Sequence, residues 1–269
     1  MMRNFFLLSI IILSSGCVTS ERLRYAELNP VYGAEPKNVN LIINAYPLKT
    51  PGPTVIYAHG CSGLDGAYLD WKNKLNDWGY NVVQPDSMKS RGVKRACNEK
   101  ERESVSNKDR LEDVIEASKW VQQQSWHSGK IGVIGYSMGG LAALNLASDG
   151  GEYYPYTDKV DQDIYVTKYV SAVIAFYPAC KMSHREAKVP SLILIGELDT
   201  WTPVRRCDQL AALGNKNITL IKYPGAYHSF DTPGFNQVNG YGHMIKYNPQ
   251  AAADAEMRTR EFFEKYLKN

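Results

Sequence analysis

Short apolar runs, separated by polar and glycine-rich stretches, recur along the chain from residue 39 onward. Runs that are apolar at every position are typical of strands buried in a parallel sheet, whereas a looser alternation indicates a strand with one exposed face. On this basis we predict strands over residues 39–46, 54–58, 81–84, 130–135, 171–176, 191–195 and 218–222.

Helical periodicity appears between these strands. Residues 109–124 place Leu111, Val114 and Ile115 on one side, as an amphipathic helix does. We predict further helices over residues 68–78, 138–147, 205–213 and 249–267. Strands that alternate with helices indicate the α/β class, with a mostly parallel central sheet and helices on both faces. Residues 39–269 therefore form one predicted domain, and ligands are expected at the carboxyl ends of its strands.

The first residues read as an export signal. Residues 1–16 contain one positive charge, an apolar run too short to span a bilayer as a helix, and small residues before Cys17. This layout resembles a bacterial lipoprotein signal, although Ser14 stands where such signals usually carry leucine. We expect Cys17 to be lipidated, residues 17–38 to be an irregular tether, and the protein to face the periplasm or cell exterior from a membrane of the bacterial cell envelope. The alternatives are an ordinary secretory signal and a buried N-terminal strand.

Composition narrows the class of function. Lysine and arginine number 31 against 28 aspartates and glutamates, for a formal charge of +3. This near balance argues against a nucleic-acid partner, which usually requires a basic excess. The chain is 44% hydrophobic, which is ample for a packed domain. No metal-binding cluster is apparent, and neither a metal nor a cofactor is expected.

A glycine–serine motif links the strand over residues 130–135 to the helix over residues 138–147. It reads GYSMGG over residues 135–140, the G-x-S-x-G pattern in a strand–turn–helix context. The pattern predicts a sharp, strained turn that raises the Ser137 hydroxyl above the sheet, and makes Ser137 the candidate nucleophile. The alternative is a glycine-rich turn that only packs tightly. A dinucleotide loop fits less well, because G-x-G-x-x-G is absent here.

A serine nucleophile needs a histidine base and a carboxylate that orients this base. In α/β proteins with this serine motif, the acid and then the histidine follow the serine along the chain. Asp199 comes just past the strand over residues 191–195, and we prefer it to Glu197, which is nearer the strand. His228 lies in the loop after the next strand and is the candidate base.

The other histidines are weaker candidates for the base. His127 follows a helix and His184 lies in a polar loop, so we expect both in solvent. His243 lies in a glycine- and asparagine-rich stretch and is kept as an alternative. His59 follows a strand and is expected only to brace the loop that it begins.

That loop is the candidate source of an oxyanion hole. It reads HGCSG over residues 59–63, directly after the strand over residues 54–58. In hydrolases with this motif, a loop in this position supplies one oxyanion-hole N–H and the residue after the nucleophile supplies the other. We therefore expect the backbone N–H groups of Cys61 and Met138 to be the two donors.

With these segments in place, the chain resembles the dienelactone hydrolase branch of the α/β-hydrolase superfamily. The resemblance covers most of the chain from about residue 39. It rests on HGCSG at 59–63, PDSMKSRG at 85–92, GYSMGG at 135–140, GELDTWTP at 196–203 and AYHSFD at 226–231. It implies an α/β-hydrolase fold, with Ser137 as nucleophile, Asp199 as orienting acid and His228 as base.

Two departures from this family change the expected substrate. Its founding members carry cysteine at the position of Ser137 and glutamate at the position of Gly60. We therefore expect a serine hydrolase that cleaves small-molecule carboxylic esters or lactones through an acyl-enzyme, and does not act on dienelactone itself. The alternatives are a secreted polyester or cutin hydrolase and a catalytically dead, lipid-anchored binding protein.

Four cysteines remain once Cys17 is assigned to a lipid, and they allow three pairings. Cys180 ends one strand segment and Cys207 lies in the helix that follows the next strand, so these two can pair. Cys61 and Cys97 are then left for a second disulfide. The alternative is four reduced, buried thiols.

An aromatic, polar insertion over residues 150–168 follows the nucleophile helix, and Trp201 lies close to Asp199 along the chain. Both are candidates for lining a substrate pocket. Tyrosines that merely cover the edge of the sheet are an equally good interpretation of the insertion.

Overall fold

The computed structural model describes residues 19–26, 38–64, 67–148 and 169–269. The predicted signal with Cys17 and the aromatic insertion over residues 150–168 lie outside this part of the chain. None of the helices within it has the length and apolar character needed to cross a membrane.

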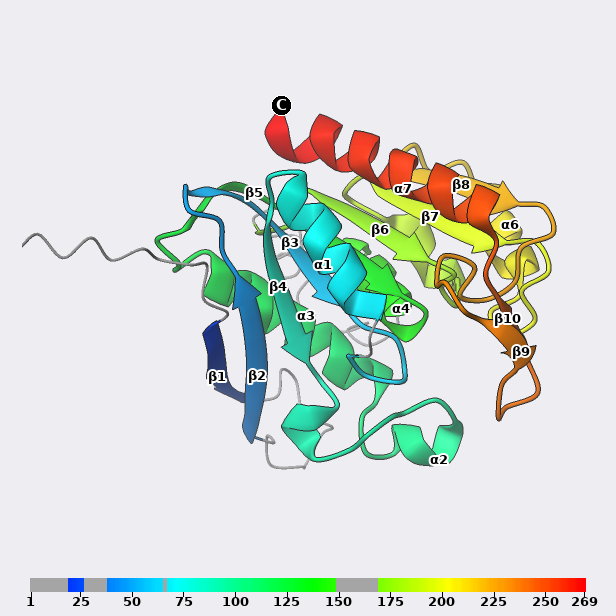
Figure 1. Ribbon diagram of the computed structural model, residues 1–269, viewed down its shortest axis with the longest axis horizontal. Coiled ribbons are helices and arrows are strands. Elements are labelled where there is room, and N and C mark those ends of the chain that lie inside the picture. The colour runs from blue at the N-terminus through cyan, green and yellow to red at the C-terminus, as the bar shows by residue number, and fades with distance from the viewer. Residues whose placement is uncertain (1–18, 27–37, 65–66, 149–168) are drawn as a thin grey trace, which may run out of the picture.

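A central sheet has the strand order β1-β2-β4-β3-β5-β6-β7-β8 (Figure 1). The β1–β2 and β2–β4 pairs are antiparallel, and all later pairs are parallel, so the predicted mostly parallel sheet is confirmed. The strands are β1 (Thr19–Ala26), β2 (Asn38–Tyr46), β3 (Gly52–Ala58), β4 (Asn81–Asp86), β5 (His127–Tyr136), β6 (Ala172–Phe176), β7 (Ser191–Gly196) and β8 (Ile218–Tyr223). A separate hairpin pairs β9 (Asn236–Val238) with β10 (Met244–Lys246).

Helices cover both faces of the sheet, with α1 and α7 on one face and α3 and α4 on the other (Figure 1). Their bounds are α1 (Ala67–Asp77), α2 (Glu99–Arg102), α3 (Asn107–Val121), α4 (Met138–Ala147), α6 (Val204–Ala211) and α7 (Pro249–Phe263), and short helical turns span Lys89–Arg91, Met182–Glu186 and Glu264–Lys268. Ser106 caps α3 by accepting a hydrogen bond from the Asp109 N–H, while the Asp109 carboxylate accepts one from the Ser106 N–H. This reciprocal capping explains why α3 begins before the predicted residue 109.

The backbones of β3, β5 and α4 meet at the start of α4. A Cβ atom on Gly139 would lie 2.0 Å from the Ala58 carbonyl oxygen, and one on Gly135 would lie 2.1 Å from the Gly139 carbonyl oxygen. No side chain fits at either position. The approach sets the start of α4 directly against the end of β3, with Ser137 at the junction.

The expectation of an irregular tether over residues 17–38 is wrong for residues 19–26, which form the edge strand β1. Leu23 pairs with Leu41 of β2 and packs against the core, whereas Glu21 and Arg22 are exposed. Charged side chains are common on edge strands, where they discourage pairing with further chains. They also make the segment too polar to be recognised as a strand from its pattern.

Of the two histidines expected in solvent, one is fully buried and the other is half-buried. His184 is completely buried, and its Nε2 lies 3.0 Å from the Asn145 side-chain oxygen. His127 begins β5, and its Nδ1 lies 2.8 Å from the Thr54 hydroxyl. Both imidazoles have a polar partner from a distant part of the chain, which local polarity does not indicate.

Two disulfides join the cysteines in the predicted pairs. Cys61 is bonded to Cys97 and Cys180 to Cys207, with Cα atoms 4.9 and 5.1 Å apart. The first ties the loop after β3 to the segment before α2, and the second ties the segment after β6 to α6. Both pairs link elements that flank the carboxyl edge of the sheet.

We expect denaturing alkylation of the oxidised protein, mapped by peptide mass, to leave all four of these cysteines unmodified. Prior reduction should make all four react. Alkylation of Cys61, Cys97, Cys180 and Cys207 without a reductant would contradict the pairing.

Candidate active site

Ser137 lies in the turn between β5 and α4 with a left-handed backbone, at φ 53° and ψ −111°. Such a conformation is costly for a residue with a side chain and persists only when the surroundings impose it. Here its N–H donates to the Phe176 carbonyl (2.9 Å), and the glycine contacts fix the turn on the other side. The side chain is partly exposed above the carboxyl edge of the sheet.

Three predicted residues form one hydrogen-bonded chain. His228 Nε2 lies 3.1 Å from the Ser137 hydroxyl, and His228 Nδ1 lies 2.7 Å from Asp199 Oδ2. Asp199 follows β7 and His228 follows β8, as the sequence indicated. Glu197 is exposed, which agrees with the preference for Asp199. His243 instead stacks on Trp201, with ring centroids 5.5 Å apart.

Thr202 holds the Asp199 carboxylate and was not identified from the sequence. Its N–H donates to Asp199 Oδ1 (2.9 Å), its hydroxyl donates to Oδ2 (2.7 Å), and the Trp201 N–H adds a further bond to Oδ1 (2.8 Å). Burial raises the pKa of Asp199, but the opposing effects of His228 and Thr202 are together larger and lower it overall. The carboxylate is therefore ionised at neutral pH. An aspartate followed three residues later by threonine is a local turn signal that could have indicated this support.

Aromatic rings enclose the His228 imidazole. The Tyr177 ring lies 4.5 Å from it and the Trp201 ring 4.9 Å, measured between centroids. Tyr177 has φ 38° and Ser229 has φ 57°, so these residues share the left-handed backbone of Ser137. Local strain of this kind gathers at functional sites, where surrounding contacts over-determine the geometry.

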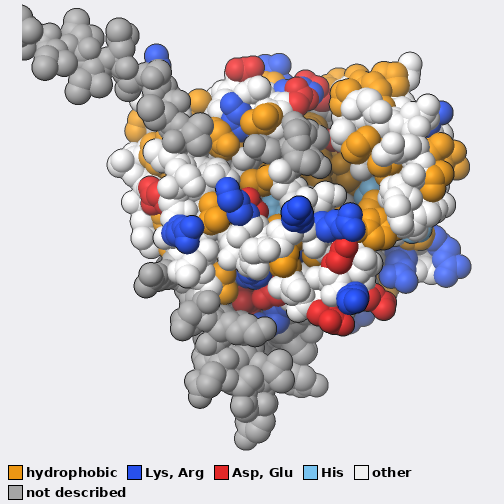
Figure 2. Space-filling model, turned by 60° about the horizontal axis from the view of Figure 1, so that its bottom comes forward, with side chains coloured by type: hydrophobic (Ala, Val, Ile, Leu, Met, Phe, Trp, Pro, Cys, Tyr) orange, Lys and Arg blue, Asp and Glu red, His pale blue; other side chains and the backbone are white. Residues whose placement is uncertain are grey.

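A pocket of about 180 Å³ opens beside Ser137 and His228. Trp201 lines it, as predicted, and further aromatic side chains complete its wall: Tyr57, Trp71, Tyr136, Tyr177, Phe235 and Tyr241. Figure 2 looks toward this side of the molecule and shows histidine side chains recessed among hydrophobic ones. Such a pocket suits a small, largely apolar substrate group.

Asp231 places a carboxyl group in this pocket, which the sequence did not indicate. Oδ2 accepts a hydrogen bond from Trp71 Nε1 (3.0 Å), and Oδ1 accepts one from the Tyr177 hydroxyl (2.9 Å). Burial raises the pKa of Asp231, and the bonds from Trp71 and Tyr177, together with the more distant positive charge of Lys74, oppose that rise. Both donors are uncharged, so they do not neutralise the carboxylate.

The two candidate oxyanion donors flank Ser137. Met138 is the first residue of α4, so its N–H has no acceptor within that helix. Cys61 and Ser137 line the same pocket. Gly60, which directly precedes Cys61, is also close to the serine, because a Cβ added to it would lie 3.9 Å from the Ser137 Cβ. The loop after β3 therefore lies directly against the serine turn.

His59 is buried below this loop. Its Nδ1 lies 2.7 Å from the Gly60 carbonyl, and its Nε2 lies 3.2 Å from the Ser87 N–H. Burial, reinforced by the positive charge of Arg110, lowers the pKa of His59 well below its usual value. A neutral imidazole that joins two strand ends supports the predicted bracing role.

The described residues contain no group of three or more histidine, cysteine, aspartate or glutamate side chains arranged to hold a metal ion.

The sequence is similar to proteins of known family. The sequence profile of the Dienelactone hydrolase family matches residues 42–267. Carboxymethylenebutenolidase from Pseudomonas putida is 26% identical over 201 residues, which cover 68% of this chain and 77% of that protein.

Solved structures show the same fold. A putative dienelactone hydrolase from Klebsiella pneumoniae is 18% identical, with a TM-score of 0.65 over 92% of this chain and all of that one. A member of the α/β serine hydrolases without a lid, from Xanthomonas campestris, is 15% identical, with a TM-score of 0.57 over 93% of this chain and 96% of that one. These similarities confirm the predicted α/β-hydrolase fold.

We expect Asp199→Asn to lower kcat for p-nitrophenyl acetate by roughly 10⁴, because an amide can hold the imidazole in the wrong tautomer and cannot stabilise its protonated form. Glu197→Gln, two residues away on the same loop, is the matched control and should retain wild-type kcat. A large loss in Glu197→Gln with little change in Asp199→Asn would reverse the assignment of the acid.

Proposed function

Because the chain belongs to the dienelactone hydrolase family, we propose that it is a serine hydrolase that cleaves carboxylic esters or lactones through an acyl-enzyme. The observation that carries this proposal is the continuous set of hydrogen bonds from Ser137 through His228 to Asp199. The family membership supports hydrolysis, and the residue at the turn supports oxygen as the attacking atom.

In the proposed reaction, His228 Nε2 takes the hydroxyl proton as Ser137 Oγ attacks the ester carbonyl. Asp199 holds His228 Nδ1–H and so keeps Nε2 free to accept that proton. The carbonyl oxygen becomes an oxyanion and receives hydrogen bonds from the N–H groups of Cys61 and Met138.

The tetrahedral intermediate then collapses. The C–O bond to the leaving alcohol breaks, and protonated His228 gives its proton to that alcohol. Water attacks the resulting acyl-enzyme with His228 again acting as base, and the carboxylic acid and free Ser137 are released. No electron transfer or added co-reactant other than water is required.

Ser137→Ala should reduce p-nitrophenyl acetate turnover by a factor on the order of 10³ or more, because no other group replaces the attacking oxygen. Ser128→Ala changes an exposed serine at the far end of β5 and is expected to leave turnover unchanged. Hydrolysis that survives in Ser137→Ala at the wild-type rate would contradict the proposed nucleophile.

The two disulfides indicate an exported protein, since such bonds persist in oxidising compartments. We extend this to a lipid anchor on Cys17, which the resemblance of residues 1–17 to a lipoprotein signal supports. Cys17→Ser should move the protein from the detergent phase to the aqueous phase in a detergent partition assay. An unchanged partition would exclude the lipid.

The carboxylate of Asp231 is expected to make the pocket prefer uncharged substrates to anionic ones. A substrate carboxylate in this pocket would meet a like charge in a poorly solvated place. Arg95, the cation at the rim, is paired with Glu101 at 2.8 Å and offers little compensation.

The p-nitrophenyl esters of butyric and succinic acid form a matched neutral and anionic pair. We expect Asp231→Asn to raise kcat/KM for the succinate monoester relative to the butyrate by roughly tenfold at pH 8. Asp208→Asn alters a surface ion pair on α6 and should not change the ratio. If Asp231→Asn also leaves the succinate-to-butyrate ratio of kcat/KM unchanged, Asp231 does not discriminate between neutral and anionic substrates.

A further inference from the structure

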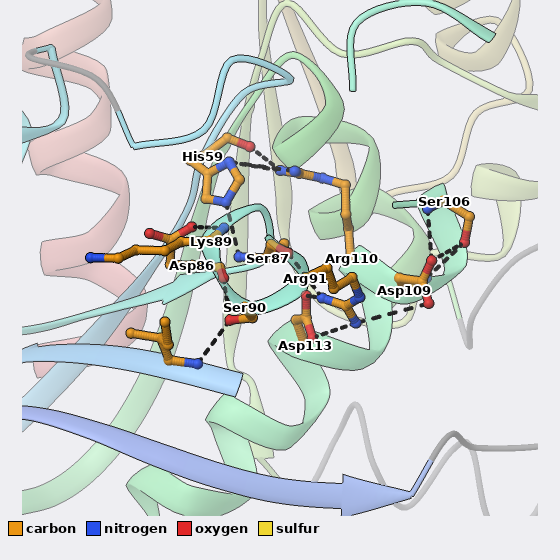
Figure 3. Close-up of polar contacts among 11 residues, drawn as sticks. His59, Asp86, Ser87, Lys89, Ser90, Arg91, Ser106, Asp109, Arg110 and Asp113 are labelled. Atoms are coloured by element: carbon orange, nitrogen blue, oxygen red, sulfur yellow. Dashed lines mark hydrogen bonds and ion pairs between the residues drawn. The ribbon is translucent and has the colours of Figure 1, made fainter. Parts of the chain in front are cut away.

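A polar cluster extends from His59, the first residue of the loop after β3, to α3 (Figure 3). It contains Arg110, which projects from α3 and is only 2% exposed. A buried guanidinium costs free energy unless its surroundings provide charges and acceptors for it. The catalytic steps proposed above do not use this side chain, so its role needs a separate explanation.

Arg110 contacts the backbone of the loop. One of its terminal nitrogens donates a hydrogen bond to the His59 carbonyl oxygen. Both terminal nitrogens also lie 3.4 Å from His59 Nδ1. Figure 3 shows the guanidinium group directed from α3 toward His59. The same His59 carbonyl faces Gly139, where an added Cβ would lie 2.6 Å from it.

Burial keeps the His59 ring neutral by lowering its pKa, and the positive charge of Arg110 adds to this effect. A neutral imidazole has one donor nitrogen and one acceptor nitrogen. Because the Ser87 N–H donates to Nε2, Nε2 is the acceptor, and the proton lies on Nδ1. His59 Nδ1–H therefore donates to the Gly60 carbonyl (2.7 Å).

This bond acts on the oxyanion donor directly. The Gly60 carbonyl and the Cys61 N–H belong to one planar, trans peptide unit, so they point in opposite directions. Holding the carbonyl toward His59 turns the N–H away from the buried cluster. A hydrogen bond to the carbonyl also polarises the peptide and strengthens its N–H as a donor.

The carbonyl group and the side chain of Cys61 are also held in place. Its carbonyl accepts a hydrogen bond from the Ala96 N–H (2.8 Å), and its side chain is bonded to Cys97. Three successive carbonyls, those of His59, Gly60 and Cys61, thus each have a fixed donor, and the first of these donors is Arg110. The Gly60 carbonyl has a second donor within the loop, the Gly63 N–H (3.2 Å).

Charged neighbours help to keep Arg110 ionised. Burial lowers its pKa to about 10, and the carboxylates of Asp113 and Asp86 oppose that effect. Asp113 is itself held by two bonds from Arg91, at 2.8 and 3.1 Å. The guanidinium remains charged at neutral pH and is tied to α3, the helix beside α4.

We propose that Arg110 is a positioning residue for the oxyanion hole, acting through the His59 carbonyl and the neutral His59 ring to fix the direction of the Cys61 N–H. The inference rests on the proposed function, since it requires an oxyanion on the substrate of Ser137. It assigns a catalytic consequence to a buried side chain that never touches the substrate.

The test compares p-nitrophenyl acetate with its thionoester, in which sulfur replaces the carbonyl oxygen. Sulfur is a weak hydrogen-bond acceptor, so a thionoester gains little from oxyanion donors. We expect Arg110→Met to lower kcat for the ester by about tenfold or more, with little change in KM. The thionoester rate should fall much less, so that the ester-to-thionoester ratio falls.

Arg110→Lys keeps the charge but offers a shorter, single-point donor. Its ratio should fall between those of the wild type and Arg110→Met, and it decides the question alone if Arg110→Met does not fold. Lys119→Met removes a cation from the last turn of the same helix, where it pairs with Glu116, and should keep the wild-type ratio.

Labelling of Ser137 by a fluorophosphonate fixes the concentration of active protein in each variant. A loss of structure alone would lower the rates on both substrates equally, and that result in Arg110→Met would overturn the role of Arg110. If Arg110→Met does not fold, an unchanged ratio in Arg110→Lys would overturn it. A wild-type protein that hydrolyses the ester without labelling at Ser137 would instead overturn the proposed function.

Discussion

The backbone of α4 touches the backbone of β3 where Gly139 meets the Ala58 carbonyl, and the geometry of the site follows from that contact. A single Cβ at residue 139 would lie 2.0 Å from the carbonyl oxygen, so glycine is required there. The approach forces the left-handed backbone of Ser137 and sets the N-terminus of α4 against the loop of Cys61. The nucleophile and both candidate oxyanion donors are therefore brought together by one packing constraint, before any polar interaction is considered.

Polar interactions then orient the groups that packing has placed. Asp199 is held by Thr202 and holds His228, while Arg110 and His59 hold the loop on the opposite side of Ser137. Both sets of residues are buried, where a hydrogen bond is stronger than in water and an unpaired polar group costs more free energy. A disulfide also fastens the loop of Cys61 to Cys97, and a second joins the segment after β6 to α6, the helix that follows the Asp199 loop.

Local sequence patterns predicted the strands from β2 to β8 and the serine turn, because each depends on residues within a few positions of one another. The acid and the base were predicted because each directly follows a recognisable strand. They did not predict β1, whose only apolar anchor among the described side chains is Leu23 on a charged edge. Nor did they predict the Arg110–His59 and Trp71–Asp231 contacts, which join residues 51 and 160 positions apart. Such pairs depend on how α3 and α1 pack, and a single sequence contains no local signal for that packing.

In the proposed mechanism, Ser137 carries the acyl group during turnover. This role of Ser137 is tested most directly by rapidly quenching the protein during hydrolysis of an ester that deacylates slowly, and mapping the acyl mass by peptide sequencing. We predict a stoichiometric acyl adduct on the Ser137 hydroxyl that disappears as product acid is released. Turnover without an adduct, or an adduct on another residue that forms and decays at the catalytic rate, would contradict it.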